Sequence, residues 1–253
     1  MQRSHNAIQL TGLGADDLAQ LYAYPTGRDA PWVRANFVAS VDGAATSGDV
    51  SAGLGTPADK QVFTLLRELA EVILVGAGTV RAENYGGART DATRRRALHE
   101  LGIGGHPDGT PPPIAVLTAS ANLEPGCRLF TDTDVPPLIV TTAAAPADRK
   151  RQLADAGGRV IEAGDLAVTP ESLLAALGEL GLHRVLCEGG PHLFGELLAA
   201  DAVDELCLTT APLLVGGTAR RISLSAHEFR RPMTRAHVLL DDDGTLLTRW
   251  ARA

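Results

Sequence analysis

The fold is constrained most by an alternation of short apolar runs with helical stretches between Trp32 and Ala200. Residues 72–75 are apolar throughout, which is typical of a strand covered on both faces of a parallel sheet. Thr56 and Pro57 predict a helix start, because Thr caps free N–H groups and Pro suits the first turn. Strands separated by helices predict an α/β fold with a mainly parallel central sheet and flanking helices.

The expected elements extend this pattern along the chain. We expect strands over 32–39, 72–75, 114–118, 138–142, 159–162 and 184–187. We expect helices from 57 and over 93–101, 146–156, 170–180 and 191–200. Strand-like runs at 203–210, 236–240 and 245–250, with a hairpin signal at Asp243-Gly244, predict an antiparallel C-terminal edge.

Residues 1–30 resemble an N-terminal extension with a short helix over 15–22, followed by a turn-rich linker. We therefore expect one domain over 31–253.

Composition excludes several classes of function. The net charge of −7 argues against general nucleic-acid binding. No run of eighteen apolar residues and no secretion signal are visible, so we expect a cytoplasmic protein without a membrane span. The three cysteines form no C-x-x-C pair and the histidines show no metal-binding spacing, so we expect no metal site.

Three strand ends carry unusual residues. Ser40-Val41-Asp42-Gly43 places a carboxylate where it could bond a ligand amide or hydroxyl, although a plain turn has the same pattern. In the turn from Gly76 to Thr79, Gly76 and Gly78 allow positive φ and the close approach of a phosphate. A bare strand-to-helix turn would look similar, so both interpretations stay open.

The third strand end, Glu188-Gly189-Gly190-Pro191, favours a functional interpretation. The free N–H groups between Gly189 and His192, which Pro191 lacks, could face an anion at the start of a helix. A plain Gly-Gly-Pro turn would leave the carboxylate of Glu188 unexplained.

These motifs occur in a fixed order. Ser40-Val41-Asp42-Gly43 comes first, followed by Leu66-Arg67, the turn with Thr79 and Glu83, Glu188-Gly189-Gly190-Pro191, Val203-Asp204-Glu205-Leu206, and Pro212 with Gly216-Gly217. In this order and spacing, the chain resembles the pyrimidine reductases of riboflavin biosynthesis, the RibD C-terminal, dihydrofolate-reductase-like family. The resemblance implies a dihydrofolate-reductase-like fold, a homodimer, NADPH as the cofactor and a small pyrimidine or pterin as the substrate.

The resemblance also assigns roles by position. The implied cofactor-binding residues are Val38, Ser40, Gly76, Gly78, Thr79, Glu83, Ser120, Gly189, Gly190, Pro191, His192, Leu193, Phe194, Gly195 and Glu196. The implied substrate-binding residues are Asn36, Ser51, Arg67 and Glu188. The family delivers hydride to C1′ of a ribosylamino-pyrimidine phosphate. We expect Glu188 and Asp42 to act as catalytic residues that orient the pyrimidine and ribose, and Arg67 to help hold the substrate phosphate.

The chain departs from the family pattern on the substrate side. Asn36 stands where many bacterial members have Lys, and Glu83-Asn84-Tyr85-Gly86-Gly87 replaces the usual D-[DN]-P-x-L. The deaminase motifs H-x-E and P-C-x-x-C are missing, so we expect a stand-alone reductase. Two alternatives stay open: a reductase of dihydrofolate or another pterin on the same scaffold, and a non-catalytic NADPH-binding regulator.

Overall fold

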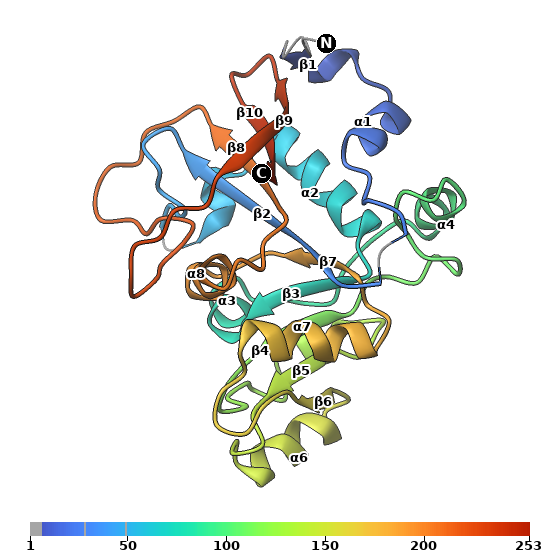
Figure 1. The fold of residues 1–253 in the computed structure, drawn as a ribbon, viewed down its shortest axis with the longest axis vertical. Helices are drawn as coiled ribbons and strands as arrows, with labels where there is room; N and C mark the ends of the chain where they lie inside the picture. Colours follow the sequence, from blue (N-terminus) through green and yellow to red (C-terminus); the bar gives the residue numbers. More distant parts are fainter. Residues whose placement is uncertain (1–6, 28, 49) are drawn as a thin grey trace.

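A computed structural model describes residues 7–27, 29–48 and 50–253. Within them, ten strands form one sheet in the order β1-β9-β10-β8-β2-β7-β3-β4-β5-β6 (Figure 1). The strands are β1 (Ile8–Gln9), β2 (Trp32–Ser40), β3 (Val72–Gly76), β4 (Ile114–Leu117), β5 (Leu138–Thr141), β6 (Arg159–Glu162), β7 (Arg184–Cys187), β8 (Glu205–Ala211), β9 (Met233–Leu240) and β10 (Leu246–Arg252).

The direction of the strands confirms the predicted sheet. All pairs from β8 to β6 in this order are parallel, whereas β10 runs antiparallel to both β8 and β9. The hairpin between β9 and β10 turns at Gly244, which has a φ of +91°. The α/β class, the mainly parallel sheet and the antiparallel C-terminal edge are therefore confirmed.

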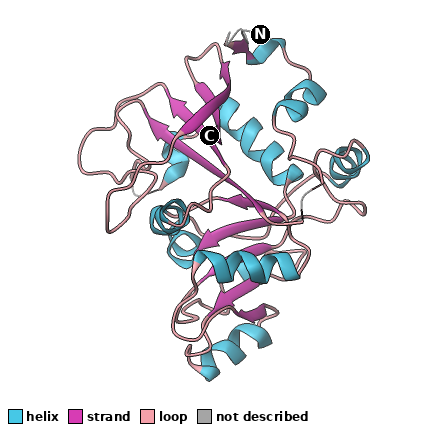
Figure 2. Ribbon diagram, viewed as in Figure 1, coloured by secondary structure: helices cyan, strands magenta, loops and turns pink. Residues whose placement is uncertain are grey.

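Helices cover both faces of the sheet (Figure 2). They are α1 (Ala15–Leu21), α2 (Pro57–Leu69), α3 (Ala77–Ala82), α4 (Ala92–Glu100), α5 (Arg128–Thr131), α6 (Ala147–Asp155), α7 (Pro170–Glu179) and α8 (Pro191–Ala199), with two 3₁₀ turns, η1 (Leu10–Gly12) and η2 (Ser51–Leu54). None of these helices is long and apolar enough to cross a membrane.

The side chains of β3 divide between two hydrophobic cores, because successive residues of a strand point to opposite faces. Ile73 and Val75 belong to the core that includes α2, while Val72 and Leu74 belong to the core that includes α7 and α8. This double burial explains why residues 72–75 are apolar without alternation.

Helix α2 carries a site residue on its less buried side. The side chain of Thr56 accepts a hydrogen bond from the Asp59 amide at 3.2 Å, as its N-cap position predicts. Leu66 and Leu69 are fully buried against the sheet. Arg67, which lies between them in the sequence, lines a cavity instead.

The segment before Trp32 contributes to the core, although its sequence resembles an extension. β1 pairs with β9, and Leu18, Tyr22 and Tyr24 are buried in the core shared with α2. Residues 1–6 and Arg28 lie outside the described residues. Packing therefore joins residues 7–27 to the sheet. The expected domain boundary near residue 30 stays a prediction.

A buried ion cluster ties this segment to the sheet. Arg34 in β2 donates to Glu205 in β8 at 2.6 Å and to the carbonyl oxygen of Tyr22 at 2.7 Å. Arg249 in β10 also pairs with Glu205, and it donates to the carbonyl oxygen of Leu21 at 2.7 Å. The side chain of Arg34 is 0% exposed, so its charge depends on Glu205 for compensation.

We predict that Glu205→Gln lowers the free energy of unfolding by about 3–5 kcal/mol, because it leaves Arg34 buried without a carboxylate. Urea unfolding followed by circular dichroism measures the change. Glu100→Gln on the exposed surface of α4 is the matched control and should change stability by less than about 0.5 kcal/mol. Equal effects of the two substitutions would contradict the proposed role of the cluster.

Candidate active site

The carboxyl ends of the parallel strands open into a cavity of about 1090 Å³. Its walls come from the loop after β2, from α2, from the turn between β3 and α3, from the turn between β7 and α8, and from the loop after β8. Parallel strands bring their carboxyl ends to one edge, which is where ligands bind in open α/β sheets. Four of the sequence motifs therefore meet in one place.

Glu188 lies at the centre of the polar contacts in this cavity. Arg67 donates from Nε to Oε1 at 2.8 Å and from Nη2 to Oε2 at 2.7 Å. Tyr85 donates from its hydroxyl to Oε2 at 2.6 Å. The side chains of Glu188 and Arg67 are 3% and 14% exposed, so this pair is largely shielded from water.

Aromatic rings surround the same ion pair. The guanidinium carbon of Arg67 lies 4.2 Å from the ring centroid of Phe63 and 5.7 Å from that of Tyr85. Burial, and then the negative charge of Glu188, raise the pKa of the Tyr85 hydroxyl well above its ordinary value. Tyr85 therefore stays a neutral hydrogen-bond donor at neutral pH.

Tyr85 reaches Glu188 because helix α3 ends in a tight reversal. Asn84 has a φ of +50°, in the left-handed region. The amide of Tyr85 donates to the carbonyl oxygen of Val80 at 3.0 Å. Asn tolerates this conformation at helix ends better than most residues do.

A glycine-lined wall lies next to Glu188. The Gly76 amide donates to the carbonyl oxygen of Gly189 at 2.8 Å, which joins the ends of β3 and β7. A Cβ atom on Gly190 would lie 2.5 Å from the hydroxyl oxygen of Thr79, so a larger residue there would force the Thr79 side chain to move. A Cβ atom on Gly78 would meet no atom within 4 Å, so this position is open.

Neither Gly76 nor Gly78 uses the positive φ that glycine allows. Gly76 is the N-cap of α3 with a φ of −80°, and Gly78 lies inside that helix. Positive φ occurs instead at Gly189, where φ is +90°. The helix starts at once after β3, so no left-handed turn is needed between the two elements.

Helix α8 begins at the cavity. Gly190 is its N-cap, and Gly190, Pro191, His192 and Leu193 line the cavity. The next three residues that the resemblance assigns to the cofactor do not line the cavity, because they lie on other faces of the helix. Phe194 packs on Phe37 with the ring centroids 4.6 Å apart, a Cβ atom on Gly195 would clash with the carbonyl oxygen of Leu224, and Glu196 is exposed.

The carboxylate of Asp42 is occupied by hydrogen bonds from the protein, two of which come from the loop after β8. It accepts a hydrogen bond from the hydroxyl of Ser40 and accepts from the amides of Val215 at 3.1 Å and Gly216 at 2.7 Å. The Ser40 hydroxyl, followed by these two amides, lowers the pKa of Asp42 to about 2. Asp42 therefore anchors the loop after β8, and its expected contact with a ligand stays a prediction.

The predicted site residues divide into two groups. Those that line the cavity are Ser51, Arg67, Gly76, Gly78, Thr79, Glu83, Glu188, Gly190, Pro191, His192 and Leu193. Those that lie outside its lining are Asn36, Val38, Ser40, Asp42, Ser120, Gly189, Phe194, Gly195 and Glu196. Asn36 is 9% exposed within β2, and Ser120 is exposed after β4. The roles of both groups stay predictions.

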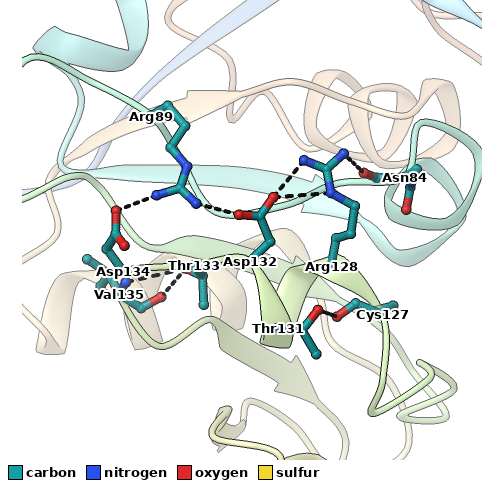
Figure 3. A network of polar contacts seen from close by, with 9 residues as sticks. All are labelled: Asn84, Arg89, Cys127, Arg128, Thr131, Asp132, Thr133, Asp134 and Val135. Carbon is teal, nitrogen blue, oxygen red and sulfur yellow. Dashed lines mark hydrogen bonds and ion pairs between the residues drawn. The ribbon is translucent and has the colours of Figure 1, made fainter.

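Several residues of the cavity wall could not be assigned from the sequence. Tyr85 was visible only as a departure from the family pattern, without a role. Phe63 looks like an ordinary residue of α2. Arg89 and Arg128 lie on the rim, where they share the carboxylate of Asp132 (Figure 3). No local sequence signal connects residues that are about forty positions apart.

No group of three or more potential metal ligands occurs among the described residues.

Comparisons with known proteins place this geometry in a family. Residues 31–247 match the model of the RibD C-terminal domain. A protein of Aquifex aeolicus called 2,5-diamino-6-ribosylamino-4(3H)-pyrimidinone 5′-phosphate reductase is 27% identical over 87% of this chain and 96% of its own. A protein of the same name from Methanothermobacter thermautotrophicus is 27% identical over 84% of this chain and 95% of its own.

A solved structure agrees with these sequence comparisons. The pyrimidine reductase-like protein of Corynebacterium diphtheriae superposes with a TM-score of 0.79 and 26% identity, covering 93% of this chain and 98% of that one. The chain belongs to the RibD C-terminal domain family.

Proposed function

We propose that this chain is an NADPH-dependent oxidoreductase that reduces a ribosylamino-pyrimidine phosphate in riboflavin biosynthesis. The observation that carries the proposal is the Glu188 carboxylate, held by Arg67 and Tyr85 beside a glycine-lined wall in one large cavity. Family membership and the names of the reductases from Aquifex aeolicus and Methanothermobacter thermautotrophicus support it.

The glycine-lined wall suits a dinucleotide. Gly78 leaves open space, and Gly190 lets the backbone pass close to Thr79. The first turn of α8 presents backbone N–H groups that can face a phosphate. When bound, the reduced nicotinamide supplies the hydride that turns the ribosyl group into a ribityl chain. The protein supplies orientation and electrostatics.

The Glu188 end of the cavity suits a pyrimidine rich in N–H groups. A carboxylate offers about four acceptor positions. Arg67 and Tyr85 fill three of them, which leaves one on Oε1. The phenol oxygen of Tyr85 donates its single hydrogen to Glu188, so it can only accept from a ligand. The ring amino groups of the pyrimidine would supply the donors.

We also propose a cytoplasmic homodimer, as the family resemblance implies. Val41 and Leu214 are 63% and 75% exposed, and exposed apolar side chains of this kind often mark a subunit contact.

We expect loss of NADPH absorbance at 340 nm when the purified protein receives the ribosylamino-pyrimidine phosphate. Dihydrofolate, tested separately, should give no loss. Turnover of dihydrofolate alone would replace the proposed substrate with a pterin. Tight NADPH binding without turnover of either compound would point to a regulator instead.

We expect Glu188→Gln to lower kcat/KM by about 100-fold, because the pyrimidine loses a charged acceptor and Arg67 loses its partner. NADPH affinity and the circular dichroism spectrum should stay close to those of the unsubstituted protein. Glu179→Gln at the exposed end of α7 is the matched control. Unchanged kinetics in Glu188→Gln would rule out this role.

We expect Tyr85→Phe to raise KM for the pyrimidine about threefold to tenfold, because one hydrogen bond to Glu188 and one acceptor are lost. The affinity for NADPH should not change. Tyr24→Phe removes a hydroxyl that donates to the carbonyl oxygen of Val185 at 3.4 Å, and because neither residue lines this cavity it serves as the control. An equal rise in KM in both variants would indicate a general structural effect.

A further inference from the structure

Four arginines line the cavity among the described residues: Arg67, Arg89, Arg128 and Arg220. Charge compensation distinguishes them. A guanidinium whose charge is already balanced by a carboxylate attracts a ligand anion less strongly than an unpaired guanidinium does.

Three of the four have carboxylate partners. Arg67 pairs with Glu188 inside the cavity. On the rim, Arg89 pairs with Asp132 and Asp134, and Arg128 donates two hydrogen bonds to Asp132 (Figure 3). The positive charges of these three residues are therefore matched within the protein.

Arg220 is the exception. Within 7–27, 29–48 and 50–253, it forms no ion pair, although it lines the same cavity. It belongs to the long loop between β8 and β9, whose residues 215–220 line the cavity. The neighbouring Arg221 is also exposed but does not line the cavity.

The backbone of this loop is held in place at two points. The Ala45 amide donates to the carbonyl oxygen of Arg220 at 2.9 Å. Asp42 binds the amides of Val215 and Gly216, a few residues earlier. The backbone that carries Arg220 is therefore fixed, so the binding of an anion has to order only the exposed side chain.

We propose that Arg220 is the anion subsite of this cavity and binds a phosphate monoester of the ligand. Its planar guanidinium can hold two phosphate oxygens at once. The phosphate belongs to either the pyrimidine substrate or the dinucleotide, and this identification of the ligand rests on the proposed function. Asp42 then acts as a positioning residue, because it fixes the loop that carries Arg220.

The test compares Arg220→Gln with Arg221→Gln, which removes an equal charge one residue away. Inorganic phosphate is the first probe, titrated against the melting temperature at constant ionic strength. We expect a saturable rise in the unsubstituted protein and in Arg221→Gln that is lost in Arg220→Gln. The same response in all three proteins, or in none, would overturn the proposal.

Two ligand pairs then identify the source of the phosphate. NADPH is compared with NADH by fluorescence titration, and the pyrimidine phosphate is compared with its dephosphorylated form by KM. We expect Arg220→Gln to weaken the phosphorylated member of one pair by about tenfold or more and to spare the other member. Equal loss within both pairs would overturn the proposal. Failure of the proposed function would appear separately, as absent turnover in the unsubstituted protein with the phosphate response intact.

Discussion

The buried cluster of Arg34, Glu205 and Arg249 determines how the antiparallel edge meets the parallel sheet. It joins β2, β8 and β10 and holds the carbonyl groups at the end of α1. A buried arginine is tolerated only with its charge and donors satisfied, so these elements must pack together. The loops that follow β2 and β8 form one wall of the cavity, and their positions therefore depend on a cluster at the other end of the same strands.

Much of the fold could be predicted because its signals are local. The apolar run at 72–75, the cap at Thr56 and the turn at Gly244 each depend on nearby residues, and the structure has each feature where it was expected. The structure of the segment before Trp32 was harder to predict, because its short strand β1 forms only by pairing with β9, over 220 residues away. Its composition resembles a linker, whereas its burial is decided by tertiary contacts.

The candidate site was predictable to a similar extent. Strand-end motifs indicated Glu188 and the glycine turns, since the topology of a parallel sheet brings such ends together. Arg67, which lies inside α2, was indicated only by the family resemblance. Side-chain pairing was not predictable, because it depends on distances across the cavity. Arg67 was expected near a phosphate, yet two of its nitrogens bind Glu188. The sequence alone does not distinguish a compensated arginine from an available one.

The departures from the family pattern acquire a physical explanation in this arrangement. Glu83 accepts a hydrogen bond from the Ser51 amide at 2.7 Å, which links the end of α3 to the loop after β2. Two residues later, Tyr85 donates to Glu188. The altered segment therefore contacts two residues that the resemblance assigns to the substrate. These substitutions change the hydrogen-bonding groups around Glu188 while Glu188 itself is kept. Under the proposed function, they therefore bear on which pyrimidine binds more than on whether hydride transfer occurs.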